Sequence, residues 1–167
     1  KDEILVTAGG GDVGTALFTA ALASATQSYR RWRVLVGGRD AAARVAQLTR
    51  VAPGNVLLEP TRPDFPAMLH VAGASVSMCG YNTALDLLQS GCPSVLIPFD
   101  AGSEVEQTLR GQALAQRPGF EVIKSADLDT ARLTAALDRL LQAPRRDKVT
   151  TGFDGAAQTV RIVTKLR

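Results

Sequence analysis

The sequence is poor in several residues that mark particular protein classes. It contains one histidine and two cysteines among 167 residues, and aromatic residues make up only 5%. Cys79 and Cys92 lack the spacing of a metal site or a disulfide framework, which indicates a reduced, cytoplasmic protein without a bound metal. The scarcity of aromatic residues among the basic ones argues against nucleic-acid binding, although the net charge is +3.

Long apolar runs are also missing. No run approaches the roughly 20 residues that span a bilayer, and no signal-peptide pattern opens the sequence. Hydrophobic residues nevertheless make up 46% of the chain, enough for one well-buried core. We therefore expect one domain over residues 1–167 and no transmembrane segment.

Short apolar runs alternate with amphipathic helical patterns throughout the chain. The runs predict strands at residues 4–8, 32–36, 56–59, 74–78, 94–99 and 120–123. Helical spacing follows them, including segments at 82–89 and 104–116, a helix capped by Asp129, and a last helix from Asp154. This order predicts a doubly wound, Rossmann-like α/β fold, with a parallel sheet of about six strands and helices on both faces.

Ligands of such folds bind where loops leave the carboxyl ends of the strands. The first of these loops contains Gly9, Gly11 and Gly14 in the spacing G-x-G-x-x-G, which is typical of a dinucleotide-binding turn. An NAD site also needs an acidic residue at the end of the second strand, but this strand ends in two glycines and Arg39. Arg39 would suit a 2′-phosphate, so an NADP-binding oxidoreductase domain is one alternative.

The second loop opens a helix at Gly80. A helix N-terminus presents unpaired N–H groups and a partial positive charge, which suit a phosphate. Asn82 and Thr83 add side-chain donors there, and we expect Asp86, in the first turn, to accept two ribose hydroxyls. The structural alternative is a capping box, in which Asn82 or Thr83 caps the helix and Asp86 completes the box.

The third loop leads into a helix whose predicted first turns carry Glu104, Glu106 and Gln107. Carboxylate and amide groups at such a position suit sugar hydroxyls, because they accept and donate hydrogen bonds in pairs. The alternative is a favourable interaction between the acids and the dipole of a surface helix.

Three segments together carry a resemblance: "ILVTAGGG" at 4–11, "SMCGYNTALDLLQSGCPSVLIPF" at 77–99 and "EVEQTLRGQAL" at 104–114. They resemble the carboxyl-terminal, donor-binding domain of GT-B fold glycosyltransferases, within the MurG-like group of glycosyltransferase family 28, which includes predicted bacterial enzymes. The resemblance spans roughly residues 4–141. It implies binding of a nucleotide-diphospho-sugar, with a UDP-sugar such as UDP-GlcNAc favoured, as the donor half of an inverting glycosyltransferase.

The resemblance also implies which residues bind the donor. They are Gly10 and Gly11 at the diphosphate with Asp12 at the rim, Gly80, Tyr81, Asn82 and Thr83 at the phosphates, Asp86 at the ribose, Glu106 and Gln107 at the sugar with Arg110 nearby, and Thr61 and Arg62 at the base. Many relatives have glutamate in place of Asp86, and glycine or serine in place of Cys79. These two departures motivate a third alternative, a non-catalytic module of the same fold.

Complete members of the family carry an amino-terminal domain that binds the acceptor and usually supplies the catalytic base. We expect that domain to be absent from this chain, which begins at Lys1, and we expect the chain alone to be inactive. The resemblance implies no cofactor and no strict need for a metal, because the helix dipole and backbone amides neutralise the departing nucleoside diphosphate. It places any peripheral membrane contact in the absent domain.

Overall fold

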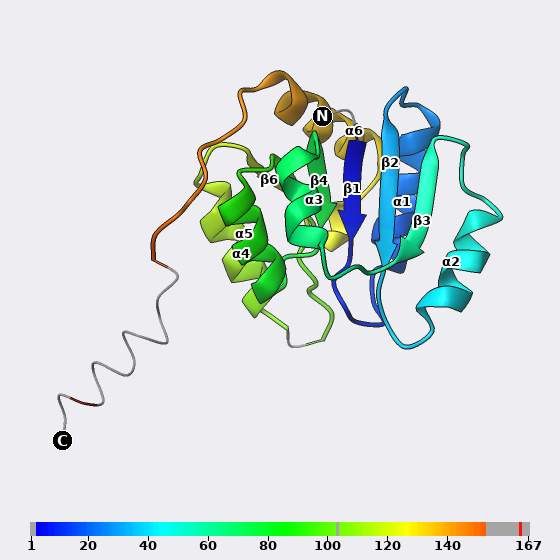
Figure 1. Cartoon of the computed structure of the whole chain (residues 1–167), viewed down its shortest axis with the longest axis horizontal. Coiled ribbons are helices and arrows are strands. Elements are labelled where there is room, and N and C mark those ends of the chain that lie inside the picture. The colour runs from blue at the N-terminus through cyan, green and yellow to red at the C-terminus, as the bar shows by residue number, and fades with distance from the viewer. Residues whose placement is uncertain (1–2, 103, 153–163, 165–167) are drawn as a thin grey trace.

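The computed structural model describes residues 3–102, 104–152 and 164. The described chain forms one six-stranded parallel sheet in the order β3-β2-β1-β4-β5-β6, flanked by helices (Figure 1). The strands are β1 Glu3–Thr7, β2 Arg31–Val36, β3 Val56–Pro60, β4 Ala74–Ser77, β5 Ser94–Leu96 and β6 Phe120–Val122. The helices are α1 Thr15–Thr26, α2 Ala41–Thr49, α3 Phe65–Val71, α4 Tyr81–Ser90, α5 Glu106–Ala115 and α6 Thr130–Gln142. The predicted doubly wound sheet is confirmed.

The element boundaries differ from the sequence-based ones by a few residues. β5 ends at Leu96 rather than Phe99, and Pro98 beyond it has no N–H to continue the ladder. The Asp129 cap of α6 is confirmed, since its Oδ1 accepts the Arg132 N–H at 2.7 Å. The last helix, predicted from Asp154, lies outside the described residues.

Each face of the sheet packs against its own set of helices. Alternate residues of a strand point to opposite faces, so Ile4 and Val6 pack with α1, α2 and α6, whereas Leu5 packs with α3, α4 and α5. Figure 1 shows α3, α4 and α5 in front of one half of the sheet and α1 behind the other half.

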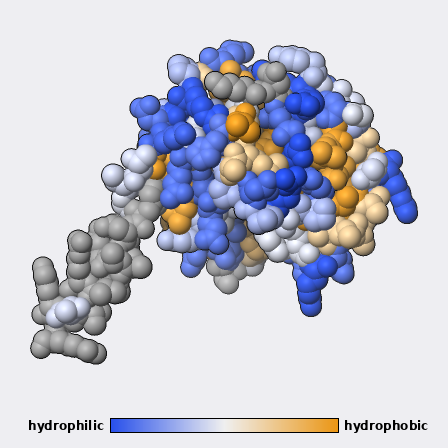
Figure 2. Space-filling view, viewed as in Figure 1, coloured by the Kyte–Doolittle hydropathy of each residue, from blue (hydrophilic) through white to orange (hydrophobic). Residues whose placement is uncertain are grey.

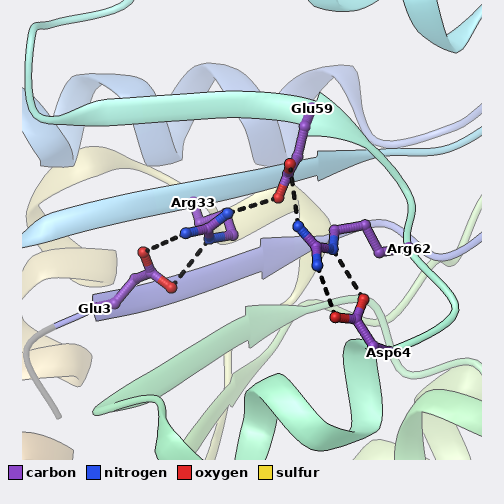
Figure 3. A network of polar contacts seen from close by, with 5 residues as sticks. All are labelled: Glu3, Arg33, Glu59, Arg62 and Asp64. Atoms are coloured by element: carbon purple, nitrogen blue, oxygen red, sulfur yellow. Dashed lines mark hydrogen bonds and ion pairs between the residues drawn. The ribbon is translucent and has the colours of Figure 1, made fainter.

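No described helix covers the front of β2 and β3 in Figure 1. Ion pairs occupy part of this face instead. The Arg33 guanidinium bonds to Glu3 of β1 at 3.1 Å and to Glu59 of β3 at 2.8 Å, and all three side chains are about three-quarters buried (Figure 3). Figure 2 shows apolar surface over β3, where Leu57 is half exposed. The prediction of helices on both faces is therefore correct for the sheet as a whole but not for this corner.

Two consecutive arginines after α6 hold the ends of two helices. Arg145 donates to the carbonyls of Leu69, Ala72 and Ser90, and Arg146 donates to those of Leu87, Leu88 and Cys92. The last carbonyls of a helix have no partner within it and carry a partial negative charge, so a guanidinium is well suited to them. These contacts fix the C-terminal end of α4, whose N-terminal end lies at the candidate site.

Candidate functional site

The three loops named by the sequence meet at the carboxyl end of the sheet. Parallel pairing places β1 beside β4 and β4 beside β5, so the loops that follow these strands are neighbours. The Gln107 side chain joins two of them, because its Oε1 accepts the N–H of Cys79 at 3.0 Å and of Phe99 at 3.2 Å. The expectation that these loops share one site is consistent with this arrangement.

The glycine loop after β1 is held tightly on both sides. Gly14 has a φ of +103°, and a Cβ there would lie 2.3 Å from that of Ala8, so only glycine allows α1 to begin this close to the strand. A Cβ at Gly37, just past β2, would lie 2.1 Å from the Gly9 carbonyl oxygen. The loop therefore rests against the end of β2, where an NAD site would place an acidic side chain.

Asp12 and Arg39 contact each other at the rim of the glycine loop. Asp12 Oδ1 accepts the backbone N–H of Arg39 at 2.9 Å, and its other oxygen lies 3.7 Å from Arg39 Nε. The Arg39 side chain is 92% exposed. Asp12 thus has a structural contact that fixes the position of the chain after β2.

The start of α4 differs from the capping alternative. Its N-cap residue is Gly80, and no side chain caps the helix. The capping box is therefore wrong, because Asn82 and Thr83 already lie inside the first turn. Asp86 also lies in the second turn rather than the first, on the same helix face as Thr83. The Asp86 carboxyl is half-buried, and burial raises its pKa.

Gly10 and Gly80 are not required by the packing of the protein. An added Cβ at either position would meet nothing within 4 Å, and neither residue has a positive φ. Glycine at these two positions leaves the backbone N–H groups open to a close approach from outside. This arrangement is suited to an anion.

A cavity of about 140 Å³ opens between the glycine loop, the loop after β3 and α4. Its lining residues are Thr7, Gly9, Gly10, Leu35, Thr61, Arg62, Phe65 and Thr83. The structure therefore brings together Gly10, Thr61, Arg62 and Thr83, which the sequence named from separate segments. Sequence reasoning missed the apolar walls, Leu35 and Phe65, because nothing local distinguishes them from other core positions.

Arg62 reaches this cavity already paired with acids. Its guanidinium bonds to both Asp64 oxygens, at 2.8 and 2.7 Å, and lies 3.5 Å from Glu59 (Figure 3). The ion pair raises the pKa of Arg62 and lowers that of Asp64. Glu59 also bonds to Arg33, so the rim of the cavity is tied to the ion pairs on the face of β1 and β2.

The acidic and amide residues of the third loop lie beside α4 and differ in their contacts. Gln107 uses its side-chain carbonyl oxygen to join two loops, and its amide N–H₂ group has no hydrogen-bond partner among the described residues. Glu106 is 79% exposed and lies 3.6 Å from Arg110. Arg110 donates to the Cys79 carbonyl at 2.7 Å and stacks over the exposed ring of Tyr81. Glu104 precedes α5 and accepts the Glu106 N–H at 2.8 Å.

Neither cysteine is placed as a nucleophile. Cys79 and Cys92 are free and buried, and burial raises the pKa of each thiol to about 11. Across the described residues, no group of three or more His, Cys, Asp or Glu is placed to hold a metal ion. Each helix in the described part of the chain is too short or too polar to cross a membrane.

The comparisons with known proteins show the family and the fold. Residues 5–159 match the family model of the glycosyltransferase family 28 C-terminal domain. Two relatives are named UDP-N-acetylglucosamine--N-acetylmuramyl-(pentapeptide) pyrophosphoryl-undecaprenol N-acetylglucosamine transferase. The one from Lactiplantibacillus plantarum is 36% identical over 95 residues, and the one from Brucella canis is 29% identical over 145 residues.

Solved structures share the fold. MurG of Acinetobacter baumannii superposes with a TM-score of 0.73 at 16% identity, covering 98% of this chain and 50% of that one. The glycotransferase of kitacinnamycin superposes with a TM-score of 0.71 at 20% identity, covering 86% of this chain and 36% of that one.

The matched segments cover 57% and 82% of this chain but only 26% and 38% of the Lactiplantibacillus and Brucella proteins. The chain thus corresponds to a part of those longer relatives. Because the family model matches residues 5–159, which is most of the chain, the chain belongs to the glycosyltransferase family 28 C-terminal domain family.

Proposed function

We propose that this chain binds a nucleotide-diphospho-sugar as the donor half of an inverting glycosyltransferase, with a UDP-sugar such as UDP-GlcNAc as the donor. The observation that carries the proposal is the cavity at the carboxyl end of the sheet, which combines the glycine loop, Thr61, Arg62 and Thr83 beside the N-terminus of α4. The names of the Lactiplantibacillus and Brucella relatives support UDP-GlcNAc as the donor.

The diphosphate would lie between the two open glycines. The first turn of α4 offers backbone N–H groups without helical partners, and the helix dipole adds a partial positive charge. Gly10, Gly11 and Gly80 would bind the diphosphate through their N–H groups, with Tyr81, Asn82 and Thr83 around it. The same groups would stabilise the negative charge of the departing nucleoside diphosphate, so this role calls for no metal or cofactor.

The nucleoside would extend from the phosphates toward the loop after β3. Its base would occupy the cavity between Leu35 and Phe65, against the backbone of Thr61 and Arg62. Asp86, one helical turn beyond Thr83, would accept hydrogen bonds from the ribose hydroxyls. Glu106 and the free amide N–H₂ of Gln107 would hold the donor sugar, with Arg110 and Asp12 at the rim.

The chain itself would hold the donor and stabilise the leaving group. We propose that the acceptor site and the catalytic base belong to an amino-terminal domain, as the resemblance implies. On this proposal the 167-residue chain binds nucleotide but transfers no sugar by itself.

Titration calorimetry with UDP tests the proposal. Asp86→Ala should weaken binding by about 1–3 kcal/mol, because two ribose hydroxyls lose their acceptor. Asp138→Asn, at the opposite end of the sheet, is the matched control and should leave the affinity unchanged. Unchanged affinity in Asp86→Ala would contradict the assignment, and stronger binding of NADPH than of UDP would favour the oxidoreductase alternative. Absence of any nucleotide binding by a folded sample would favour a non-catalytic module.

The pH dependence gives an independent test. Because burial raises the pKa of Asp86, its carboxylate should become protonated at a higher pH than an exposed aspartate does. Binding of UDP should therefore weaken on acidification earlier than in Asp86→Asn, whose profile reports only the titration of UDP itself. Identical profiles for the two proteins would show that Asp86 does not contact the nucleotide.

A further inference from the structure

A line of ion pairs crosses β1, β2 and β3 and ends at the cavity that we assign to the nucleotide (Figure 3). It runs from Glu3 through Arg33, Glu59 and Arg62 to Asp64. The first three side chains are about three-quarters buried, so salt screens their charges less than those of a surface pair. Only Arg62 of these five residues lines the cavity. A displacement within the line therefore reaches the cavity through Arg62.

The cavity end of this line is a tight turn after β3. The Phe65 N–H donates to the Arg62 carbonyl at 3.3 Å, and Pro63 takes the second position of the turn. Asp64 takes the third position with a φ of −88° and a ψ of 11°, as in a type I turn. Asp64 is also the N-cap residue of α3, but its side chain does not cap the helix. Both of its oxygens bind the Arg62 guanidinium across the turn instead, so this ion pair holds the turn that places Phe65 and Arg62 at the cavity.

The Glu59 carboxylate is shared unequally between two guanidinium groups. Its Oε1 accepts from Arg33 at 2.8 Å, whereas its Oε2 lies 3.5 Å from the nearest nitrogen of Arg62. Glu3 binds the other side of the Arg33 guanidinium at 3.1 and 3.2 Å and fixes its orientation. Without Arg33, the one cation left within 4 Å of Glu59 among the described residues would be Arg62. A partly buried carboxylate is costly to leave unpaired, so Glu59 would then turn to Arg62 and compete for it with Asp64.

We propose that Arg33 is a positioning residue for nucleotide binding, a role that rests on the function proposed above. By holding Glu59, it leaves Arg62 with Asp64 and so keeps the turn after β3 in the shape that receives the base. Arg33 does not line the cavity, and it acts only through the two residues that follow it in the line. Its removal should therefore disturb the base side of the cavity, whereas the further removal of the Glu59 charge should cancel that disturbance.

Titration calorimetry with UDP on the 167-residue chain tests this role. Arg33→Met should weaken UDP binding about tenfold, because Glu59 then draws Arg62 away from Asp64. The double variant Arg33→Met/Glu59→Gln should bind UDP within about twofold of the unchanged protein, because a neutral amide does not compete for Arg62. Arg139→Met is the matched control and should leave the affinity unchanged. It leaves Glu121 of β6 unpaired, and the Glu121 side chain is 26% exposed against 23% for Glu59.

The NMR signal of the Arg62 Nε–H group gives a readout in the protein without nucleotide. This group donates to Asp64 at 2.8 Å. Its resonance should shift in Arg33→Met and return in the double variant, whereas the control should leave it in place. Arg33→Lys retains a charge between Glu3 and Glu59 and is expected to fold even where Arg33→Met does not. An ammonium lacks the planar fork that binds both acids, so Arg33→Lys should produce smaller changes of the same kind in both measurements.

Four results would overturn the role of Arg33. Unchanged UDP affinity in both Arg33→Met and Arg33→Lys would refute it and leave the proposed nucleotide site intact. Weak binding that persists in the double variant would show that Arg33 serves the fold rather than the position of Glu59. An unmoved Arg62 signal in the Arg33 variants would refute the route through Arg62. Absence of UDP binding by the unchanged protein would refute the proposed function and the role of Arg33 together.

Discussion

Replacement of Arg146 by methionine tests how far the segment after α6 holds the sheet together. Methionine preserves an unbranched side chain, but it removes every guanidinium hydrogen bond and the contact of the guanidinium carbon with the Phe120 ring, whose centroid lies 4.1 Å away. The guanidinium donates to the carbonyls of Leu87, Leu88 and Cys92. A hydrogen bond to a charged group contributes about 1.5–3 kcal/mol, so the gross loss is roughly 4–9 kcal/mol.

Two features reduce this loss. Each carbonyl keeps another donor, because Ser90 Oγ bonds to Leu87 O, the Val149 N–H to Leu88 O, and Ser94 Oγ to Cys92 O. In addition, burial lowers the pKa of Arg146 to about 10, which shows that the folded protein holds this charge at a cost that methionine removes. We therefore expect Arg146→Met to lower the free energy of unfolding by about 2–3 kcal/mol.

Urea denaturation followed by the fluorescence of Trp32, which is 2% exposed when folded, measures this change. Arg50→Met is the matched control, since the Arg50 side chain is exposed at the end of α2, and its effect should stay within about 0.5 kcal/mol. A loss below about 0.5 kcal/mol for Arg146→Met would refute the reasoning, because the cost of burying the guanidinium would then cancel its hydrogen bonds.

Three further predictions concern the fold. Asn55 Nδ2 donates to three carbonyls between α1 and β2, and Asn55→Asp replaces this donor with an acceptor. In urea denaturation, Asn55→Asp should lower the free energy of unfolding by about 3 kcal/mol or more, and by more than Asn55→Ala does. Equal effects of the two substitutions would contradict these hydrogen bonds. Gly14→Ala should lower the free energy of unfolding by about 2 kcal/mol or more, whereas Gly54→Ala, where the added Cβ would meet nothing within 4 Å, should leave it nearly unchanged. No effect of Gly14→Ala would contradict the close approach of α1 to β1. Burial raises the pKa of Cys92 from 9.0 to about 11, so the unfolded chain loses this proton first and stability should fall as the pH rises from about 9 to 11. Thiol labelling at pH 8 should then be slow until urea is added, and rapid labelling of the native protein would contradict the burial.

The fold was largely predictable because its signals are local. A strand one residue out of phase or a helix of the wrong period would expose the core. The apolar spacing around Val34, Val76 and Val95 therefore indicates the kind of element that each segment forms. The rule that connections between parallel strands are right-handed then leaves few topologies. The open face of β2 and β3 was not predictable. The sequence around Arg33 would look the same whether a helix or an ion pair with Glu59 covered this face of the sheet.

The candidate site was predictable only as a set of loops. The rule that ligands bind at the carboxyl ends of strands indicated the loops of Gly10 and Thr83, and the family resemblance added Arg62; the cavity contains all three. The start of α4 at Gly80 was predicted, whereas the alternative of a side-chain cap at Asn82 or Thr83 was wrong. The joining role of Gln107 was also missed, because its acceptor bonds connect loops that are distant in the chain.

The sequence by itself determined the order and type of the elements and the family, since periodicity and short motifs are read within a few neighbouring residues. Only the tertiary structure decided which groups are paired. Arg146 spans helix and strand ends more than fifty positions away, and Glu3, Arg33 and Glu59 form one line of ion pairs although they come from β1, β2 and β3. A hydrogen bond acts over about 3 Å, and that proximity arises only once the sheet has brought distant segments together.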